Sequence, residues 1–146
     1  NKLLAMPSAS CDSNHGKNIS LNQRSVWVLN LVVAEQHVGH VLAHSPHDPN
    51  DTAWPHRGVR DIREELDNEQ IERGIITERS SMRGPYWKAI HEGGRQEREL
   101  VGQYRAWENA TLRWPRTSAL LQRIAAWWDR EAANADIRAR QDKMRE

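Results

Sequence analysis

The sequence predicts an all-α fold, in which a long antiparallel helical hairpin is completed into a small bundle of three or four helices. Between residues 85 and 143, apolar and aromatic residues recur at alternating steps of four and three, which is the spacing of a helical packing seam. The sharpest interruption is Arg113-Trp114-Pro115-Arg116, where proline ends the incoming helix and can begin the next. Two helices cannot bury the adjacent Trp127 and Trp128, so a third layer or a second copy is required.

Length and composition are those of one domain with a modest core. The chain has 146 residues, of which 38% are hydrophobic and 28% are charged. Its 21 basic and 20 acidic residues give a net charge of +1, so bulk charge favours neither nucleic acid nor a membrane surface. A single cysteine, Cys11, excludes an intrachain disulfide, and we expect a cytoplasmic protein. The longest apolar run, Val26 to Ala34, is far shorter than the roughly 20 residues that cross a bilayer, so no membrane contact is expected.

The first 57 residues are predicted to lie outside the helical core. Residues 1–24 are polar and without a period, which is typical of a flexible, disordered leader. Residues 25–57 form an N-terminal element followed by a proline-rich linker. In the first part, β-branched residues suit a strand, but the three- and four-residue spacing over residues 25–44 favours a helix capped by Ser25.

The core, residues 58–146, begins with a predicted helix over residues 58–82. Its apolar residues form two separate stripes, which are Val59, Ile62 and Leu66, and then Ile71 and Ile75. Either this helix contacts two partners or it breaks near Asp67, where Asn68 could cap a new start. We expect its charged residues to form a solvated face: Arg60, Arg63, Glu64, Glu65, Glu69 and Arg73.

The hairpin, residues 85–143, is predicted to begin at Pro85, after a break at Gly84. Its turn brings Gly93 and Gly94 opposite alanines of the second helix, where the two backbones could approach closely. Glu97 lies on the seam as a charge without an assigned partner. The seam residues of the first helix are Tyr86, Ile90, Gly93, Glu97, Leu100, Tyr104, Trp107 and Thr111.

Three histidines form the first candidate site. In a helix, steps of three and four residues bring His37, His40 and His44 onto one face, a spacing compatible with zinc ligation. Three histidines with an open fourth position could also activate water. The same stripe continues an apolar face, so a structural or solvated row of histidines is the alternative, and zinc is not our first expectation.

Arginines and aromatic residues around the turn form the second candidate site. Such groups can grip phosphates and stack bases, but the nearby acids Glu108, Asp129 and Glu131 would repel a nucleic acid. They equally compose protein–protein hot spots, and the seam favours a homo-oligomer or a helical protein partner. The candidate interaction residues are Tyr104, Trp107, Trp114, Arg116, Arg123, Trp127 and Trp128.

No catalytic constellation is present in the sequence. His91-Glu92 matches the opening of a zinc-protease motif, but the second histidine is missing. We therefore expect a non-catalytic helical module for protein–protein interaction or assembly, and an enzyme is the less favoured reading. The alternatives are a metal-binding protein that uses the histidine cluster and a nucleic-acid-associated regulator.

Overall fold

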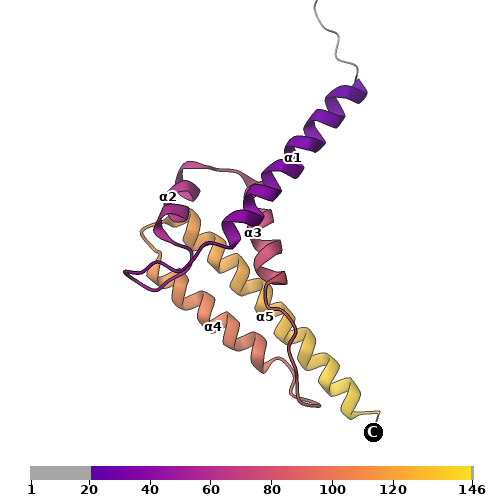
Figure 1. Ribbon diagram of the computed structural model, residues 1–146. Coiled ribbons are helices and arrows are strands. Elements are labelled where there is room, and N and C mark those ends of the chain that lie inside the picture. Colours follow the sequence, from indigo (N-terminus) through magenta and orange to yellow (C-terminus); the bar gives the residue numbers. More distant parts are fainter. Residues whose placement is uncertain (1–20, 146) are drawn as a thin grey trace, which may run out of the picture.

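The computed structural model describes residues 21–145, and every regular element in this range is an α-helix, which confirms the all-α prediction. The predicted leader, residues 1–24, lies outside the described residues as far as residue 20, and its last four residues belong to the first helix. Figure 1 shows the five helices, which are α1 (Leu21–Ala43), α2 (Arg57–Glu65), α3 (Glu69–Ser81), α4 (Arg95–Ala110) and α5 (Pro115–Lys143).

Helices α4 and α5 form the predicted antiparallel hairpin and lie side by side (Figure 1). The turn between them contains Thr111, whose hydroxyl donates to the carbonyl oxygen of Trp107 at 2.9 Å, and Pro115 is the first residue of α5. Buried apolar residues of the two helices form most of the core, namely Val101, Tyr104, Leu120, Leu121, Ile124, Ala125 and Trp128.

Helix α4 begins at Arg95 and not at Pro85, so the predicted hairpin is too long at this end. Residues 82–94, called here the α3–α4 connection, run beside the second half of α5 without regular structure (Figure 1). His91 and Gly93 within it have φ angles of 64° and 68°, in the left-handed region. A right-handed helix cannot continue through such residues, which explains the late start.

The predicted close approach at the double glycine is confirmed. A Cβ atom built on Gly94 would lie 2.6 Å from the Cα of Ala132 and closer still to its carbonyl oxygen. Only a residue without a side chain lets the start of α4 lie this close to α5.

Helix α1 confirms the helical interpretation of residues 25–44, although it begins at Leu21 and not after a Ser25 cap. It runs parallel to α3. Gln36 donates to Gln70 at 3.0 Å, and further along both helices the backbones touch at Gly39 and Gly74. A Cβ atom on Gly39 would lie 2.9 Å from the Cα of Gly74.

Of the two alternatives for residues 58–82, the break is the one observed, at residues 66–68 between α2 and α3. The side-chain oxygen of Asn68 accepts hydrogen bonds from the amides of Gln70 at 2.8 Å and Ile71 at 3.1 Å. These bonds satisfy two of the amides that a helix start leaves unpaired, as the sequence predicted.

Helix α2 faces the opposite way from the prediction. Ile62 and Leu66 are 41% and 44% exposed, whereas Arg60 and Arg63 are buried. The guanidinium of Arg60 donates to both carboxylate oxygens of Asp51 and to two backbone carbonyls of the loop before α2. Because the planar fork of arginine satisfies all these acceptors at once, burial of this charge is tolerated. The predicted solvated face is therefore wrong for the two arginines.

The proline-rich stretch before α2 is a loop, as predicted, but its tryptophan belongs to the core. Trp54 is 1% exposed, and the guanidinium of Arg79 from α3 lies 4.3 Å from its ring centre. On α4, the rings of Tyr104 and Trp107 lie 6.5 Å and 6.3 Å from Trp54, measured between ring centres. Trp54 therefore joins the α1–α3 pair to the hairpin.

Candidate functional site

Two histidines of the predicted zinc site, His37 and His40, lie on the second half of α1, and His44 directly follows its last residue, next to α3. The rings of His37 and His40 are 5.6 Å apart. His40 and His44 both contact the carboxylate of Glu78 on α3, at 3.8 Å and 2.9 Å. Among residues 21–145, no group of three or more histidine, cysteine or acidic side chains is arranged to hold a metal ion. These contacts tie α1 to α3, and zinc binding stays a prediction.

Four of the predicted interaction residues lie in or against the core of the chain itself. Tyr104 and Trp128 are 3% and 4% exposed, and Trp107 and Trp127 pack against the same cluster. Helix α5 thus covers the seam that the sequence offered to a partner. The expected partner surface at Tyr104 and Trp128 is corrected to a place in the core, because buried side chains cannot meet another protein.

The other three, Trp114, Arg116 and Arg123, connect α5 and its preceding turn to α2 and α3. The indole of Trp114 donates to a carboxylate of α2 at 2.8 Å, and the amide of Arg116 donates to another at 3.2 Å. Arg123 forms an ion pair with a carboxylate of α3. The acidic partners are Asp61, Glu64 and Glu72, respectively. Arg116 also forms an ion pair with Asp67, at 3.4 Å, so both guanidinium groups are less available to a phosphate backbone than the sequence suggested.

Glu97, the unassigned charge on the seam, has two cationic partners in the α3–α4 connection. Its buried carboxylate accepts hydrogen bonds from the guanidinium of Arg83 and from Nζ of Lys88, the latter at 2.6 Å. The Arg83 guanidinium also lies 3.5 Å from the ring centre of Tyr86. Burial acts to raise the pKa of Glu97, but the bonds from Lys88 and Arg83 outweigh it, so the pKa lies below its usual value. This cluster fastens the connection to α4.

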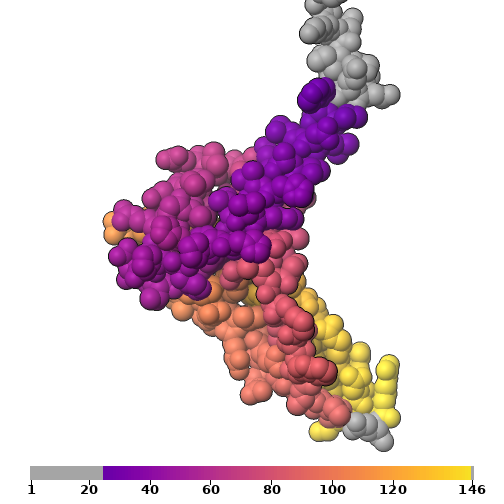
Figure 2. Space-filling view, viewed as in Figure 1, coloured from indigo at the N-terminus to yellow at the C-terminus, as the bar shows by residue number. Residues whose placement is uncertain are grey.

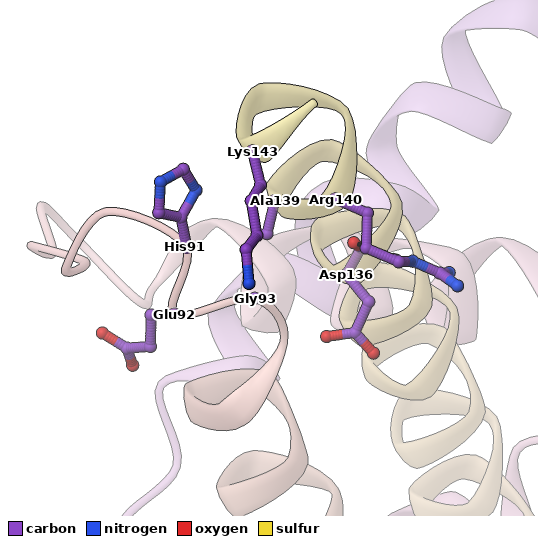
Figure 3. Close-up of a pocket in the computed structure, with 7 residues that line it drawn as sticks. All are labelled: His91, Glu92, Gly93, Asp136, Ala139, Arg140 and Lys143. Carbon is purple, nitrogen blue, oxygen red and sulfur yellow. Dashed lines mark hydrogen bonds between the residues drawn. The ribbon is translucent and has the colours of Figure 1, made fainter. Parts of the chain in front are cut away.

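A hollow of about 450 Å³ lies between the connection and the end of α5 (Figure 3). Lys143 points toward Gly93 across it, whereas the guanidinium of Arg140 points away. Asp136 accepts hydrogen bonds from the amide of Gly94, at 2.8 Å, and from Arg98, and these bonds lower its pKa. A charged carboxylate that is already paired is a poor general acid or base, so the hollow offers no catalytic pair through Asp136.

The longest run of exposed apolar side chains in the described part of the chain lies on α1. The α1 overhang, residues 25–35, extends past the start of α3, which lies level with Gln36, and it projects from the body of the molecule (Figures 1 and 2). Six of its large apolar side chains are between 51% and 68% exposed: Val26, Trp27, Val28, Leu29, Leu31 and Val33. Since consecutive residues point in different directions, apolar groups are exposed on every side of the helix.

Membrane-spanning length was not expected from the run Val26 to Ala34, but the helical stretch Ser25–Ala43 has 19 residues and a mean hydropathy of 1.2, which is enough by length and composition. Its second half, however, packs on α3, which carries the exposed charges of Glu69 and Arg73. The α1 overhang alone is about 16 Å long, roughly half of a bilayer core. Crossing a membrane would therefore require α1 to leave α3.

Comparisons with protein-family models, with curated proteins and with solved structures found no match. Sequence reasoning placed the interaction residues on the hairpin and passed over the α1 overhang. The sequence signal for this surface is the apolar run Val26 to Ala34, because a helix that is apolar on all sides needs more than one neighbour to cover it.

Proposed function

We propose that this chain is a non-catalytic helical assembly module, which binds a helix of a protein partner through the α1 overhang. The observation that carries the proposal is the exposure of apolar side chains on every side of this segment, with α3 beginning only at the level of Gln36. Contiguous apolar patches of more than a few hundred Å² are rare on soluble monomers and are typical of interaction sites.

The magnitude of the apolar surface suits reversible protein binding. Burying a Val or Leu side chain completely contributes about 1.5–3 kcal/mol, and the six side chains are already partly covered, so burial of all six would contribute roughly 5–10 kcal/mol. One partner helix covers one side of α1 and would gain about half of this. This is comparable with the lower part of the range, about 4–15 kcal/mol, that association costs in lost motion. A partner helix with its own apolar face would supply the remainder.

The proposal is tested by placing a photo-crosslinking amino acid at Leu31 in the full-length chain inside cells. Arg130, exposed on α5 and away from the α1 overhang, is the matched control position. We expect discrete protein adducts from position 31 and none from position 130. The crosslinked protein, identified by mass spectrometry, should rebind the purified wild-type chain and not a Leu31→Asp variant. Adducts with lipid alone, or equal labelling at both positions, would refute the proposed function.

A further inference from the structure

We propose that the partner of the α1 overhang is the α1 overhang of a second copy of this chain, with the two helices running antiparallel. This inference rests on the proposed function and names its partner. It is carried by one helical face that complements itself when the helix direction is reversed.

The self-complementary face contains positions 24, 28, 31 and 35. They follow one another at steps of four, three and four, so they share one side of α1. Val28 and Leu31 in the middle are 61% and 60% exposed. Position 24 is arginine and position 35 is glutamate, and these are the only Lys, Arg, Asp or Glu residues between Leu21 and Ala43.

Reversing one helix brings each of these residues opposite a suitable partner. In an antiparallel pair in which position 28 of one copy faces position 31 of the other, position 24 faces position 35. Val28 then packs on Leu31 twice, and an opposite-charge pair closes each end. A parallel pair in register would instead place Arg24 beside Arg24 and Glu35 beside Glu35, and such like-charge pairs are destabilising.

The surroundings of α1 also suit the antiparallel arrangement. The overlap of positions 24–35 is about 18 Å long and lies before Gln36, where α3 begins beside α1. Each body lies at the Gln36 end of its own helix, so the two bodies would sit at opposite ends of the pair (Figures 1 and 2). A parallel pair would bring both bodies to the same end, where they compete for space.

A lipid surface is the less suitable occupant. Asn30, an exposed amide near the centre of the α1 overhang, would enter the hydrocarbon without a partner there. In the antiparallel pair, Asn30 lies on the other side of α1 from Val28 and Leu31, so its amide stays in water.

The experiment measures the mass of the purified full-length chain by sedimentation velocity and light scattering, in low salt, from about 1 to 100 μM, the range in which a small helical interface dissociates. We expect the mass to rise with concentration from 16.9 kDa toward twice that value. Val28→Asp should remain monomeric. Val41→Asp changes another exposed valine of α1, outside the overlap, and should dimerise like the wild type. Circular dichroism should show the same helix content for both variants.

Charge exchange tests the direction of the pair. Glu35→Arg should weaken dimerisation about tenfold, and the double variant Arg24→Glu with Glu35→Arg should restore it, because the opposite charges meet again only in the antiparallel arrangement. Dimerisation without this rescue would overturn the antiparallel pairing. A mass of 16.9 kDa at every concentration would overturn self-pairing altogether, while protein adducts at Leu31 would still support the broader proposed function.

Discussion

Replacing Gly39 by alanine tests the backbone contact that joins α1 to α3. The new Cβ atom would lie 2.9 Å from the Cα of Gly74 and closer still to the carbonyl oxygen of Ile71, whereas ordinary contact begins near 3.4 Å. Both neighbours are backbone atoms, which cannot turn aside as a flexible side chain can. The two helices must therefore separate, on the order of 1 Å, which opens gaps along their close-packed contact.

Two opposing effects decide the magnitude. Alanine is better than glycine inside a helix by about 1 kcal/mol. Overpacking costs about 1–3 kcal/mol, and it belongs at the upper end here because backbone must move. We therefore expect Gly39→Ala to lower the free energy of unfolding by about 1–2 kcal/mol. Gly102 on α4 is the matched control, since a Cβ atom there meets nothing within 4 Å, and its alanine variant should gain up to about 1 kcal/mol.

Urea unfolding followed by circular dichroism measures both variants. The midpoint should fall for Gly39→Ala and rise for Gly102→Ala. Gly74→Ala opposes the same contact, so its loss should be less than additive with that of Gly39→Ala. An equal gain in stability from Gly39→Ala and Gly102→Ala would refute the backbone contact between α1 and α3.

Two carboxylates that hold cations supply the remaining predictions. Hydrogen bonds from Arg60 lower the pKa of Asp51 to about 2, below its unfolded value of about 4, so its stabilising effect is complete above pH ~4 and is lost as the pH falls toward 2. Asp51→Asn should reduce stability at pH 7 by about 3 kcal/mol, because Arg60 remains buried without its anion. The variant should also make the urea midpoint less dependent on pH in the acid range. An acid dependence as steep as that of the wild type would contradict this. Glu97→Gln leaves Arg83 and Lys88 side by side without an anion and should lower the free energy of unfolding by about 2 kcal/mol. Adding Lys88→Met should recover part of this loss. Unchanged thermal unfolding of Glu97→Gln would count against the cluster.

The sequence predicts the α4–α5 hairpin well because its signals are local. Pro115 can only begin a helix at this point, and the seam from Leu100 onward repeats without a break. The same seam cannot show that Tyr86 and Ile90 lie outside α4, where they are 51% and 82% exposed. The connection departs from the helix through left-handed residues such as His91, for which the seam spacing holds no signal.

The orientation of α2 could not be predicted, because its determinant lies in another segment. Arginines read as surface residues in any local pattern. Arg60 is drawn inward by the carboxylate of Asp51 and by carbonyl groups of the loop that precedes α2. That loop takes its shape from Trp54 in the core, a tertiary contact that periodicity does not report.

The candidate interface shows the same division between local and tertiary information. A packing seam containing Tyr104 suits a second chain as well as a helix of its own chain, and only the fold shows that α5 occupies it. The apolar character of Val26 to Ala34 is plain from the sequence. Its exposure is not, because it depends on α3 beginning level with Gln36, which only the packed structure reveals.

Helix α1 extends far beyond its crossing with α3, so a small rotation at the crossing would displace its first residues by a large distance. Gly39 and Gly74 meet without side chains that interlock, so α1 can turn relative to α3 about this point. The tip of α1 at Leu21 lies 18 residues before Gly39, about 27 Å along the helix axis, and a rotation of about 10° at the crossing would carry it about 5 Å. Small changes in the angle between α1 and α3 would thus produce large changes in the distance between the body of the molecule and a partner bound near the start of α1.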